Sequence, residues 1–168
     1  TLQPTIFCMR AKIALLPGDG IGPEVIDGAA KVLDAVAQRY GHTLSMTRSL
    51  VGAAALRAGE PPLPSATLDE CLTADAVLLG AVGDPEFSSG SREQRPETAL
   101  LDLRQALGVY ANLRPAKVWP GLEDGGSLKP ERLRGLDVLI VRELTGGIYY
   151  GEPRGRTEDR TVAFDTMR

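Results

Sequence analysis

Two patterns of apolar and polar positions alternate along the first half of the chain. Three runs are typical of strands, "AKIALL" (11–16), "TLSMTRSL" (43–50) and "ADAVLLGAVG" (74–83), and the first and third are apolar enough to be buried. Between the first two runs, apolar residues recur at helical spacing from Val25 to Tyr40, and Gly41 is a typical residue for the helix end. Strands alternating with helices predict an α/β fold with a mostly parallel sheet and helices on both faces.

Shorter helices are expected between the second and third runs, at 52–59 and at 66–73, with Ser65 as the N-cap of the latter. After residue 83 the sequence becomes more polar and richer in glycine and serine. The pattern there predicts, in order, a loop at 84–94, a helix at 96–108, an extended segment at 109–120, a loop at 121–135 and a strongly buried strand at 136–144.

Composition narrows the class of protein. The 168 residues are 43% hydrophobic and 24% charged, which is typical of globular domains, and the net charge of −3 provides no basic footprint for nucleic acid. No apolar run is long enough to cross a bilayer. The two cysteines, Cys8 and Cys71, have the spacing of neither a disulfide framework nor a metal site. So few cysteines favour a reducing, cytosol-like compartment. Cys71 is expected to be a small residue of the hydrophobic core.

The stretch "LLPGDGIGPEV" (15–25) places three glycines, Gly18, Gly20 and Gly22, between a strand and a helix. The Rossmann fingerprint is G-x-G-x-x-G, whereas this loop reads G-x-G-x-G and no acidic residue clearly follows the second strand. The glycines therefore predict a tight turn. They also allow close backbone approach to an anionic ligand at the helix N-terminus near Pro23.

Three arginines, Arg104, Arg114 and Arg142, each end an apolar stretch. Any one of them is explained by a structural ion pair. Together they form a set of guanidinium groups suited to the carboxylates of a small di-acid or tri-acid. Tyr149 and Tyr150 follow two glycines, and alternation sends their side chains to opposite faces, so one is expected to reach a cleft as an acid while the other packs or caps a turn.

Four motifs in this order, "GDGIGPEV", "ADAVLLGAVG", "RPETALLDLRQALGVYANLRP" and "LIVRELTGGIYYGEPRG", resemble the β-decarboxylating dehydrogenase family of isocitrate and isopropylmalate dehydrogenases. Within it, the resemblance is to the 3-isopropylmalate enzymes of leucine biosynthesis. The resemblance runs from Lys12 to Arg168. It implies an isopropylmalate/isocitrate dehydrogenase-like fold that is not a Rossmann fold, in which the "GDGIG" loop lies beside the nicotinamide of NAD.

The resemblance also implies a reaction: oxidation of (2R,3S)-3-isopropylmalate by hydride transfer to NAD, then loss of CO₂ to give 2-oxoisocaproate (4-methyl-2-oxopentanoate), with Mg²⁺ or Mn²⁺ acting as a Lewis acid. The apolar side chains before Arg104 in "PETALLDLR" favour an aliphatic substituent, and homoisocitrate, tartrate and isocitrate remain the alternative substrates. The implied site residues are Arg104, Arg114 and Arg142 for substrate carboxylates, Leu100 and Leu101 for the isopropyl group, Tyr149 for protonation of the enol, and Ile21, Glu97 and Thr98 for the cofactor side.

By the same resemblance the chain is expected to be an N-terminal half. Residues 1–10 would be an extension, 11–108 the first part of the cofactor-side α/β domain, and 109–168 the start of a second domain for dimerisation and substrate binding. The family's catalytic lysine and metal-binding aspartates would lie outside it, and the chain alone would be inactive. The full enzyme is expected to be a cytoplasmic homodimer without nucleic-acid or membrane partners, an organelle being left open. Two readings remain beside truncation: a natural short product that pairs with another chain, and a carboxylate-binding fragment without turnover.

Overall fold

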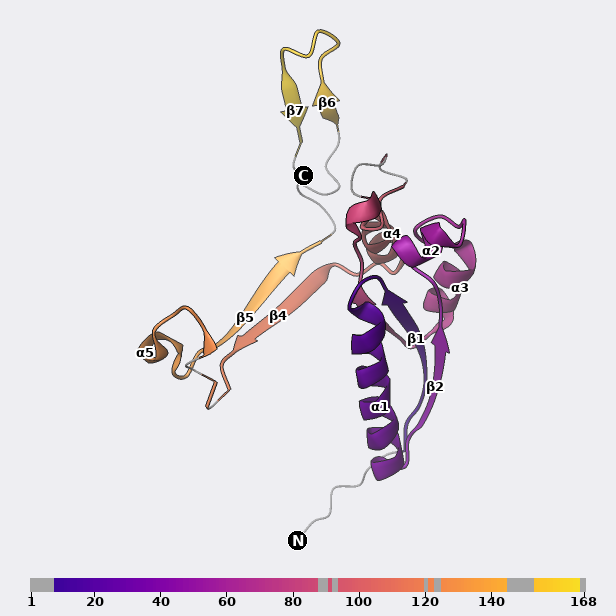
Figure 1. The fold of residues 1–168 in the computed structure, drawn as a ribbon, viewed down its shortest axis with the longest axis vertical. Helices are drawn as coiled ribbons and strands as arrows, with labels where there is room; N and C mark the ends of the chain where they lie inside the picture. The colour runs from indigo at the N-terminus through magenta and orange to yellow at the C-terminus, as the bar shows by residue number, and fades with distance from the viewer. Residues whose placement is uncertain are drawn as a thin grey trace. The chain divides into compact units, whose positions relative to one another are not determined.

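The computed structural model describes residues 8–87, 91, 94–119, 121–122, 125–144 and 153–166. The chain divides into two units, Thr1–Leu107 and Gly108–Arg168, which are described one after the other (Figure 1). Assigning the units to a cofactor-side domain and a dimerisation domain stays a prediction.

A three-stranded parallel sheet forms the centre of the first unit. The central strand β1 (Arg10–Gly18) pairs with β2 (Thr43–Arg48) on one side and β3 (Ala76–Ala81) on the other. Ile13 of β1 is in register with Met46 of β2 and with Ala76 of β3. The predicted α/β class with a parallel sheet is thereby confirmed.

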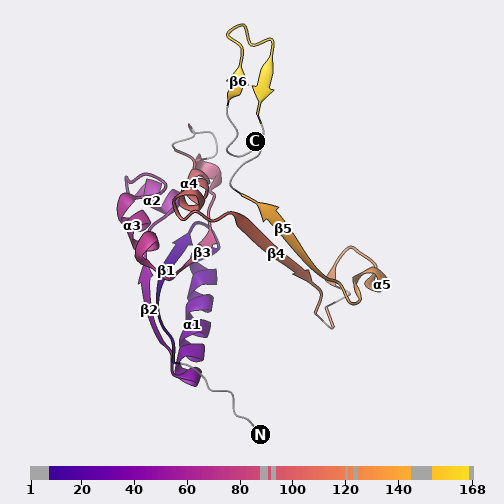
Figure 2. The same ribbon diagram turned by 180° about the vertical axis from the view of Figure 1, so that it is seen from behind.

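One face of this sheet is covered by α1 (Gly22–Tyr40), which runs alongside β1 and β2 (Figures 1 and 2). Ile13 and Leu15 point to this face and form a core with Ile26 of α1. The helix ends as predicted at Gly41, whose φ of +70° is the left-handed conformation that glycine adopts without steric cost.

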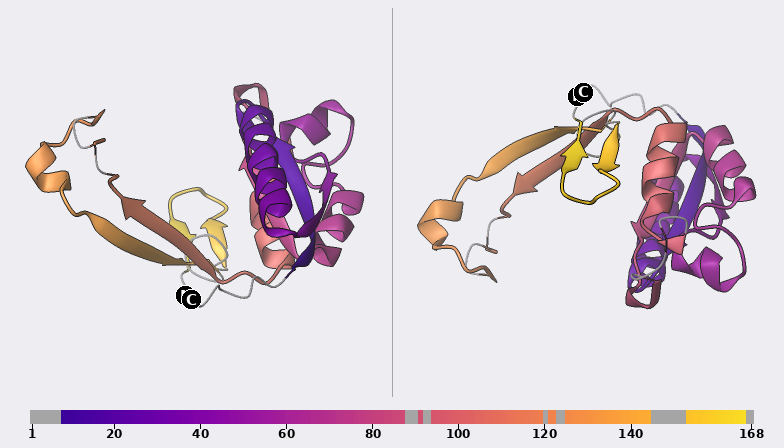
Figure 3. Two further views of the ribbon diagram at one scale, coloured as in Figure 1. Left: turned by 90° about the horizontal axis from the view of Figure 1, so that it is seen from below. Right: turned by 90° about the horizontal axis from the view of Figure 1, so that it is seen from above.

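The opposite face is covered by α2 (Ala53–Arg57), α3 (Ser65–Thr73) and α4 (Thr98–Ala106). Views from the two ends show the sheet between helical layers (Figure 3). Because successive residues of a strand point to opposite faces, Ala14 and Leu16 alternate with Ile13 and Leu15 along β1. The core on this second face consists of Ala14, Leu16, Val51, Cys71, Ala99 and Leu103, which confirms Cys71 as a core residue. Burial raises the pKa of the Cys71 thiol.

Two local predictions for the first unit are wrong. Ser65 is the first residue of α3, and Pro64 occupies the N-cap position with extended backbone and no side-chain cap bond. The run 74–83 was predicted as a buried strand, yet Ala76 of β3 is exposed and its other residues are half-buried. The reason is position: among the described strands β3 pairs only with β1, so it is an edge strand.

The second unit is built from two hairpins. Strand β4 (Ala111–Lys117) pairs antiparallel with β5 (Asp137–Glu143), and β6 (Arg154–Arg156) pairs antiparallel with β7 (Ala163–Asp165). A single helical turn, α5 (Pro130–Leu133), lies in the segment predicted to be a loop. Neither α5 nor the β6–β7 hairpin was expected from the sequence.

The prediction that residues 136–144 form a buried strand is also wrong. Leu139 is 57% exposed and Val141 63% exposed, although the run is as apolar as β1. Within the described residues β5 pairs with β4 alone and most residues of both strands are exposed, whereas each face of β1 packs into a hydrophobic core. Pro115 of β4 fits this setting, since proline is tolerated in strands at a sheet edge. Across the described parts of both units, no helix has the length and apolarity that a bilayer span requires.

Candidate functional site

The glycine turn lies at the carboxyl end of β1, and its glycines serve different purposes. A Cβ on Gly18, whose φ is +71°, would lie 1.9 Å from the carbonyl oxygen of Ala81. A Cβ on Gly22 would lie 2.0 Å from the carbonyl oxygen of Pro17. These two glycines let β1, β3 and the start of α1 pack closely. Gly20, in contrast, has no atom within 4 Å of its Cβ position, so it borders open space.

Between two of these glycines, Asp19 is a buried carboxylate that sequence reasoning missed. Only 3% of the residue is exposed. Its Oδ2 accepts hydrogen bonds from the N–H groups of Ala53 and Gly83, each at 3.0 Å, and its Oδ1 accepts one from Ala54 at 2.9 Å. The only sequence signal was an acidic residue enclosed by glycines at the end of an apolar strand.

Gly83 connects the turn to Glu97, one of the residues implied to line the cofactor side. Gly83 has a φ of +139°, and its Cβ position lies 3.1 Å from Oε1 of Glu97. The structure therefore brings the Asp19 turn and Glu97 to one edge of the sheet, beyond the carboxyl ends of β1 and β3. Ile21, which follows the turn as the N-cap of α1, is 59% exposed at the same edge. Ligand sites of parallel α/β sheets lie at this edge.

Helix α4 presents the implied substrate residues of the first unit. Ala99 and Leu103 are buried in the core, so they fix which side of the helix faces the sheet. Leu100, Leu101 and Arg104 are half-buried, and residues three or four apart on a helix share a face. Thr98, the first residue of the helix, is half-buried as well, and its hydroxyl donates to the carbonyl of Arg95 at 2.6 Å.

The other two predicted arginines share one face of the β4–β5 hairpin. Arg142 is in register with Asn112, and Arg114 lies two residues further along the same strand as Asn112. Side chains at opposite and alternate positions of a ribbon point to the same face. Nε of Arg114 donates to Oδ1 of Asn112 at 3.2 Å. Arg114 is exposed and Arg142 is half-buried, so Arg142 is less buried than the predicted buried strand at 136–144 implied.

Tyr149 and Tyr150 lie outside the described residues. Arg104 and the leucines on α4 belong to the first unit, and the two hairpin arginines belong to the second. Their assignment as substrate ligands therefore stays a prediction.

Arg57, the last residue of α2, forms ion pairs with the segment after β3, in addition to the hydrogen bond between Asp19 and Gly83. Its Nη2 contacts Oδ2 of Asp84 at 2.6 Å and Oε2 of Glu86 at 2.8 Å, and its guanidinium lies 5.5 Å from the ring centroid of Phe87. The hydrogen bond from Arg57 lowers the pKa of Asp84, and a backbone bond from Glu86 adds to this effect.

We expect the Asp84 ion pair to stabilise the protein only while Asp84 is charged. Since its pKa is lowered on folding, its contribution is present above the ordinary aspartate pKa of 3.8 and is lost as pH falls below that value. Asp84→Asn should therefore lower the thermal midpoint at neutral pH, and the difference from the unchanged protein should shrink in acid and in high salt. The control is Asp34→Asn, at an exposed position of α1. A difference that is independent of both pH and salt would contradict the ion-pair assignment.

The described residues contain no group of three or more histidine, cysteine, aspartate or glutamate side chains that could hold a metal ion. Asp159 instead organises the β6–β7 loop: its carboxylate accepts from the hydroxyls of Thr157 at 2.5 Å and Thr161 at 2.8 Å. These bonds hold the pKa of Asp159 below its usual value. Asp159 thus has a structural role in the hairpin.

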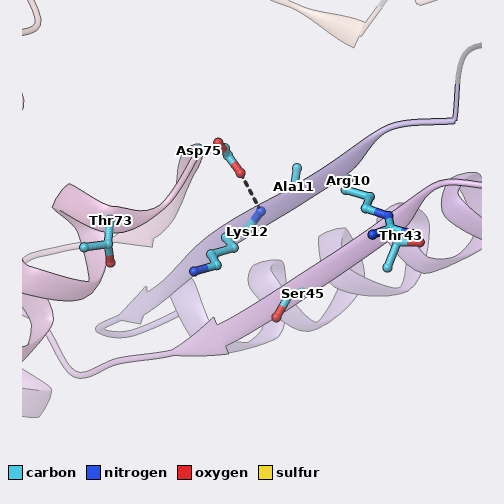
Figure 4. Close-up of a pocket in the computed structure, with 7 residues that line it drawn as sticks. All are labelled: Arg10, Ala11, Lys12, Thr43, Ser45, Thr73 and Asp75. Carbon is cyan, nitrogen blue, oxygen red and sulfur yellow. Dashed lines mark hydrogen bonds between the residues drawn. The ribbon is translucent and has the colours of Figure 1, made fainter.

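A surface depression of about 430 Å³ lies at the other end of the sheet, near the start of β1 (Figure 4). The N–H of Lys12 donates to Asp75 there at 2.8 Å. Its lining residues are Arg10, Ala11, Lys12, Thr43, Ser45, Thr73 and Asp75. The polar ones are all exposed, and the depression contains no predicted site residue, so the edge at the glycine turn is the better candidate.

Comparisons with known proteins agree with these features. A sequence model of the family described as isocitrate/isopropylmalate dehydrogenase matches residues 12–168. A 3-isopropylmalate dehydrogenase of Anaeromyxobacter dehalogenans is 54% identical over 161 residues, covering 95% of this chain and 46% of the relative. One of Salinibacter ruber is 55% identical over 147 residues, covering 88% of this chain and 40% of the relative. The chain thus spans less than half the length of these relatives.

Solved structures of isocitrate dehydrogenase and of a β-decarboxylating dehydrogenase also resemble this chain. The isocitrate dehydrogenase from Methylococcus capsulatus matches with a TM-score of 0.71 at 32% identity, covering 94% of this chain and 42% of that chain. A β-decarboxylating dehydrogenase from Thermococcus kodakarensis matches with a TM-score of 0.60 at 34% identity, covering 94% and 40%. With a family match over most of its length, the chain belongs to the isocitrate/isopropylmalate dehydrogenase family.

Proposed function

We propose that this chain forms part of an NAD-dependent 3-isopropylmalate dehydrogenase of leucine biosynthesis. The enzyme would oxidise (2R,3S)-3-isopropylmalate and release CO₂ to give 4-methyl-2-oxopentanoate. The observation that carries the choice of substrate is the pair of half-buried leucines, Leu100 and Leu101, beside Arg104 on α4. An apolar wall next to a cation suits a substrate with an aliphatic substituent and a carboxylate, and it would leave a third carboxylate unpaired. Relatives with this printed name at 54% and 55% identity support the proposal.

The proposed roles follow from side-chain chemistry. Arg104, Arg114 and Arg142 would hold the substrate carboxylates, because guanidinium groups bind carboxylates with paired hydrogen bonds. Tyr149 would give a proton to the enol carbon after CO₂ has left. Ile21, Glu97 and Thr98 would line the cofactor side of the site.

NAD, when bound, supplies the acceptor for the hydride that leaves the substrate's hydroxyl-bearing carbon. The sheet edge fits such a ligand, because Gly20 leaves the backbone open there and Ile21 presents an exposed apolar side chain. For Mg²⁺ or Mn²⁺ the described residues supply no set of donors, so we assign none of them to the metal. We further propose that the complete enzyme is a cytoplasmic homodimer.

The test is an assay of the full-length enzyme with NAD and Mg²⁺ or Mn²⁺, comparing 3-isopropylmalate with isocitrate, homoisocitrate and tartrate. We expect kcat/KM to be highest for 3-isopropylmalate. A higher value for one of the other acids would replace the proposed substrate. Absence of turnover with all four, in a folded protein, would favour a carboxylate-binding role without catalysis.

Replacing Leu100 and Leu101 together with serine should lower kcat/KM for 3-isopropylmalate about 10- to 200-fold, the usual range for lost apolar contacts in a substrate pocket. The value for malate, which lacks the isopropyl group, should change much less. Leu72→Ser is the matched control, because Leu72 is a leucine of α3 that is 52% exposed. An unchanged ranking of the two substrates in the double variant would refute the placement of the pocket.

A further inference from the structure

We propose that Asp19 is a positioning residue for NAD, which holds the cofactor-side wall of the site in shape through backbone hydrogen bonds. The inference rests on the proposed function and adds a residue that the predicted site did not include. Asp19 would act through Ile21 and Glu97, without touching the cofactor itself.

The first support is the number of separate segments that one carboxylate joins. Asp19 belongs to the turn after β1, Ala53 and Ala54 begin α2, and Gly83 follows β3. The N–H of Asp19 also donates to the carbonyl of Ala81 at 2.7 Å. One residue thus fixes the turn, a helix start and the segment after β3 at the same sheet edge.

The second support is that the surroundings are shaped to admit this carboxylate. A Cβ on Gly52 would lie 2.5 Å from Oδ2 of Asp19, and Gly52 has a φ of +71°. Oδ2 accepts one hydrogen bond from the N–H of Ala53 in α2 and one from the N–H of Gly83, and Oδ1 accepts the third from Ala54. A buried carboxylate without such partners would be strongly unfavourable, so its three bonds hold it in one orientation.

The third support is that the segments bound by Asp19 adjoin two residues proposed to line the cofactor side, Ile21 and Glu97. Two residues after Asp19 comes Ile21, exposed at the sheet edge. Gly83 donates to Asp19, and Oε1 of Glu97 lies 3.1 Å from the Cβ position of Gly83, so a side chain there would meet the carboxylate of Glu97. A shift of Gly83 would therefore move the surroundings of Glu97, and a shift of the turn would move Ile21. Both changes would alter the surface offered to NAD.

The experiment compares Asp19→Asn with Thr67→Val in the full-length enzyme, by calorimetric titration with NAD and by steady-state kinetics. The amide keeps the shape of Asp19, but its NH₂ group would face an N–H donor. Thr67 is a matched control, because it is 3% exposed and its hydroxyl donates to the carbonyl of Leu50 at 2.8 Å. Both variants lose a buried hydrogen bond, and neither side chain is proposed to touch a ligand.

We expect Asp19→Asn to raise the Kd and the KM for NAD at least about tenfold, because the residues that line the cofactor side would be displaced. The KM for 3-isopropylmalate should stay within about twofold of the unchanged enzyme. Thr67→Val should lower the thermal midpoint and leave both KM values unchanged. An unchanged Kd for NAD in folded Asp19→Asn would overturn the proposal, and so would an equal rise in Thr67→Val.

If Asp19→Asn does not fold, Gly83→Ala is the test in its place. Its added methyl group would disturb the connection from Asp19 through Gly83 to Glu97 at the Glu97 side. A raised Kd for NAD in that variant supports the proposal and an unchanged Kd overturns it. Failure of the proposed function would be recognised separately, since the unchanged enzyme would then not turn over 3-isopropylmalate with NAD.

Discussion

Replacing Gly18 with alanine should destabilise the protein by about 3 kcal/mol or more. The added methyl group would lie 1.9 Å from the carbonyl oxygen of Ala81, and that atom is backbone of the neighbouring strand. It cannot move aside as a flexible side chain does, so β1 and β3 would have to separate. The residue would also be held at a φ of +71°, which is unfavourable for any L-residue with a Cβ.

Gly20→Ala is the matched control, because it has a comparable φ of +55° with no atom near the Cβ position. Its cost should be limited to the left-handed backbone, about 1 to 2 kcal/mol. The midpoints of urea unfolding of the two variants in the full-length protein measure the difference. Equal losses would mean that close packing against Ala81 is not what requires Gly18.

Arg142→Ala should lower kcat/KM for 3-isopropylmalate about 100-fold, or about 2.7 kcal/mol in transition-state free energy. The loss follows from removing a charged group that would form paired hydrogen bonds with a substrate carboxylate. Arg142→Lys should recover only part of the activity, since a lysine ammonium offers no planar fork. Both KM and kcat are measured, because loss of binding common to ground and transition states would appear in KM alone.

Lys117→Ala removes a different cation from the same hairpin and serves as the control. Lys117 contacts Asp137 at 3.3 Å, and surface ion pairs of this kind contribute little. Its kcat/KM should remain within about twofold of the unchanged enzyme. A similar loss in both variants would show that Arg142 acts through the structure of the hairpin. An unchanged kcat/KM in Arg142→Ala would remove it from the site.

The sequence by itself determined the layered α/β organisation of the first unit. The run of apolar residues in β1 predicts a strand buried on both faces, and the cores on its two sides confirm it. The spacing from Val25 and the glycine at position 41 predicted where α1 ends. These features are local, because backbone preference and side-chain periodicity depend on neighbours in the sequence.

Only the tertiary structure decided which strands are buried and which groups accept or donate hydrogen bonds over long sequence distances. The run that forms β5 is as apolar as β1 yet is exposed, because burial depends on which segments cover a strand and not on its own composition. Asp19 lies within a loop whose glycines were visible from the start. Its three partners come from residues 34 to 64 positions further along the chain. No local pattern encodes such contacts, since they exist only once the sheet has brought the carboxyl ends of β1 and β3 to the start of α2.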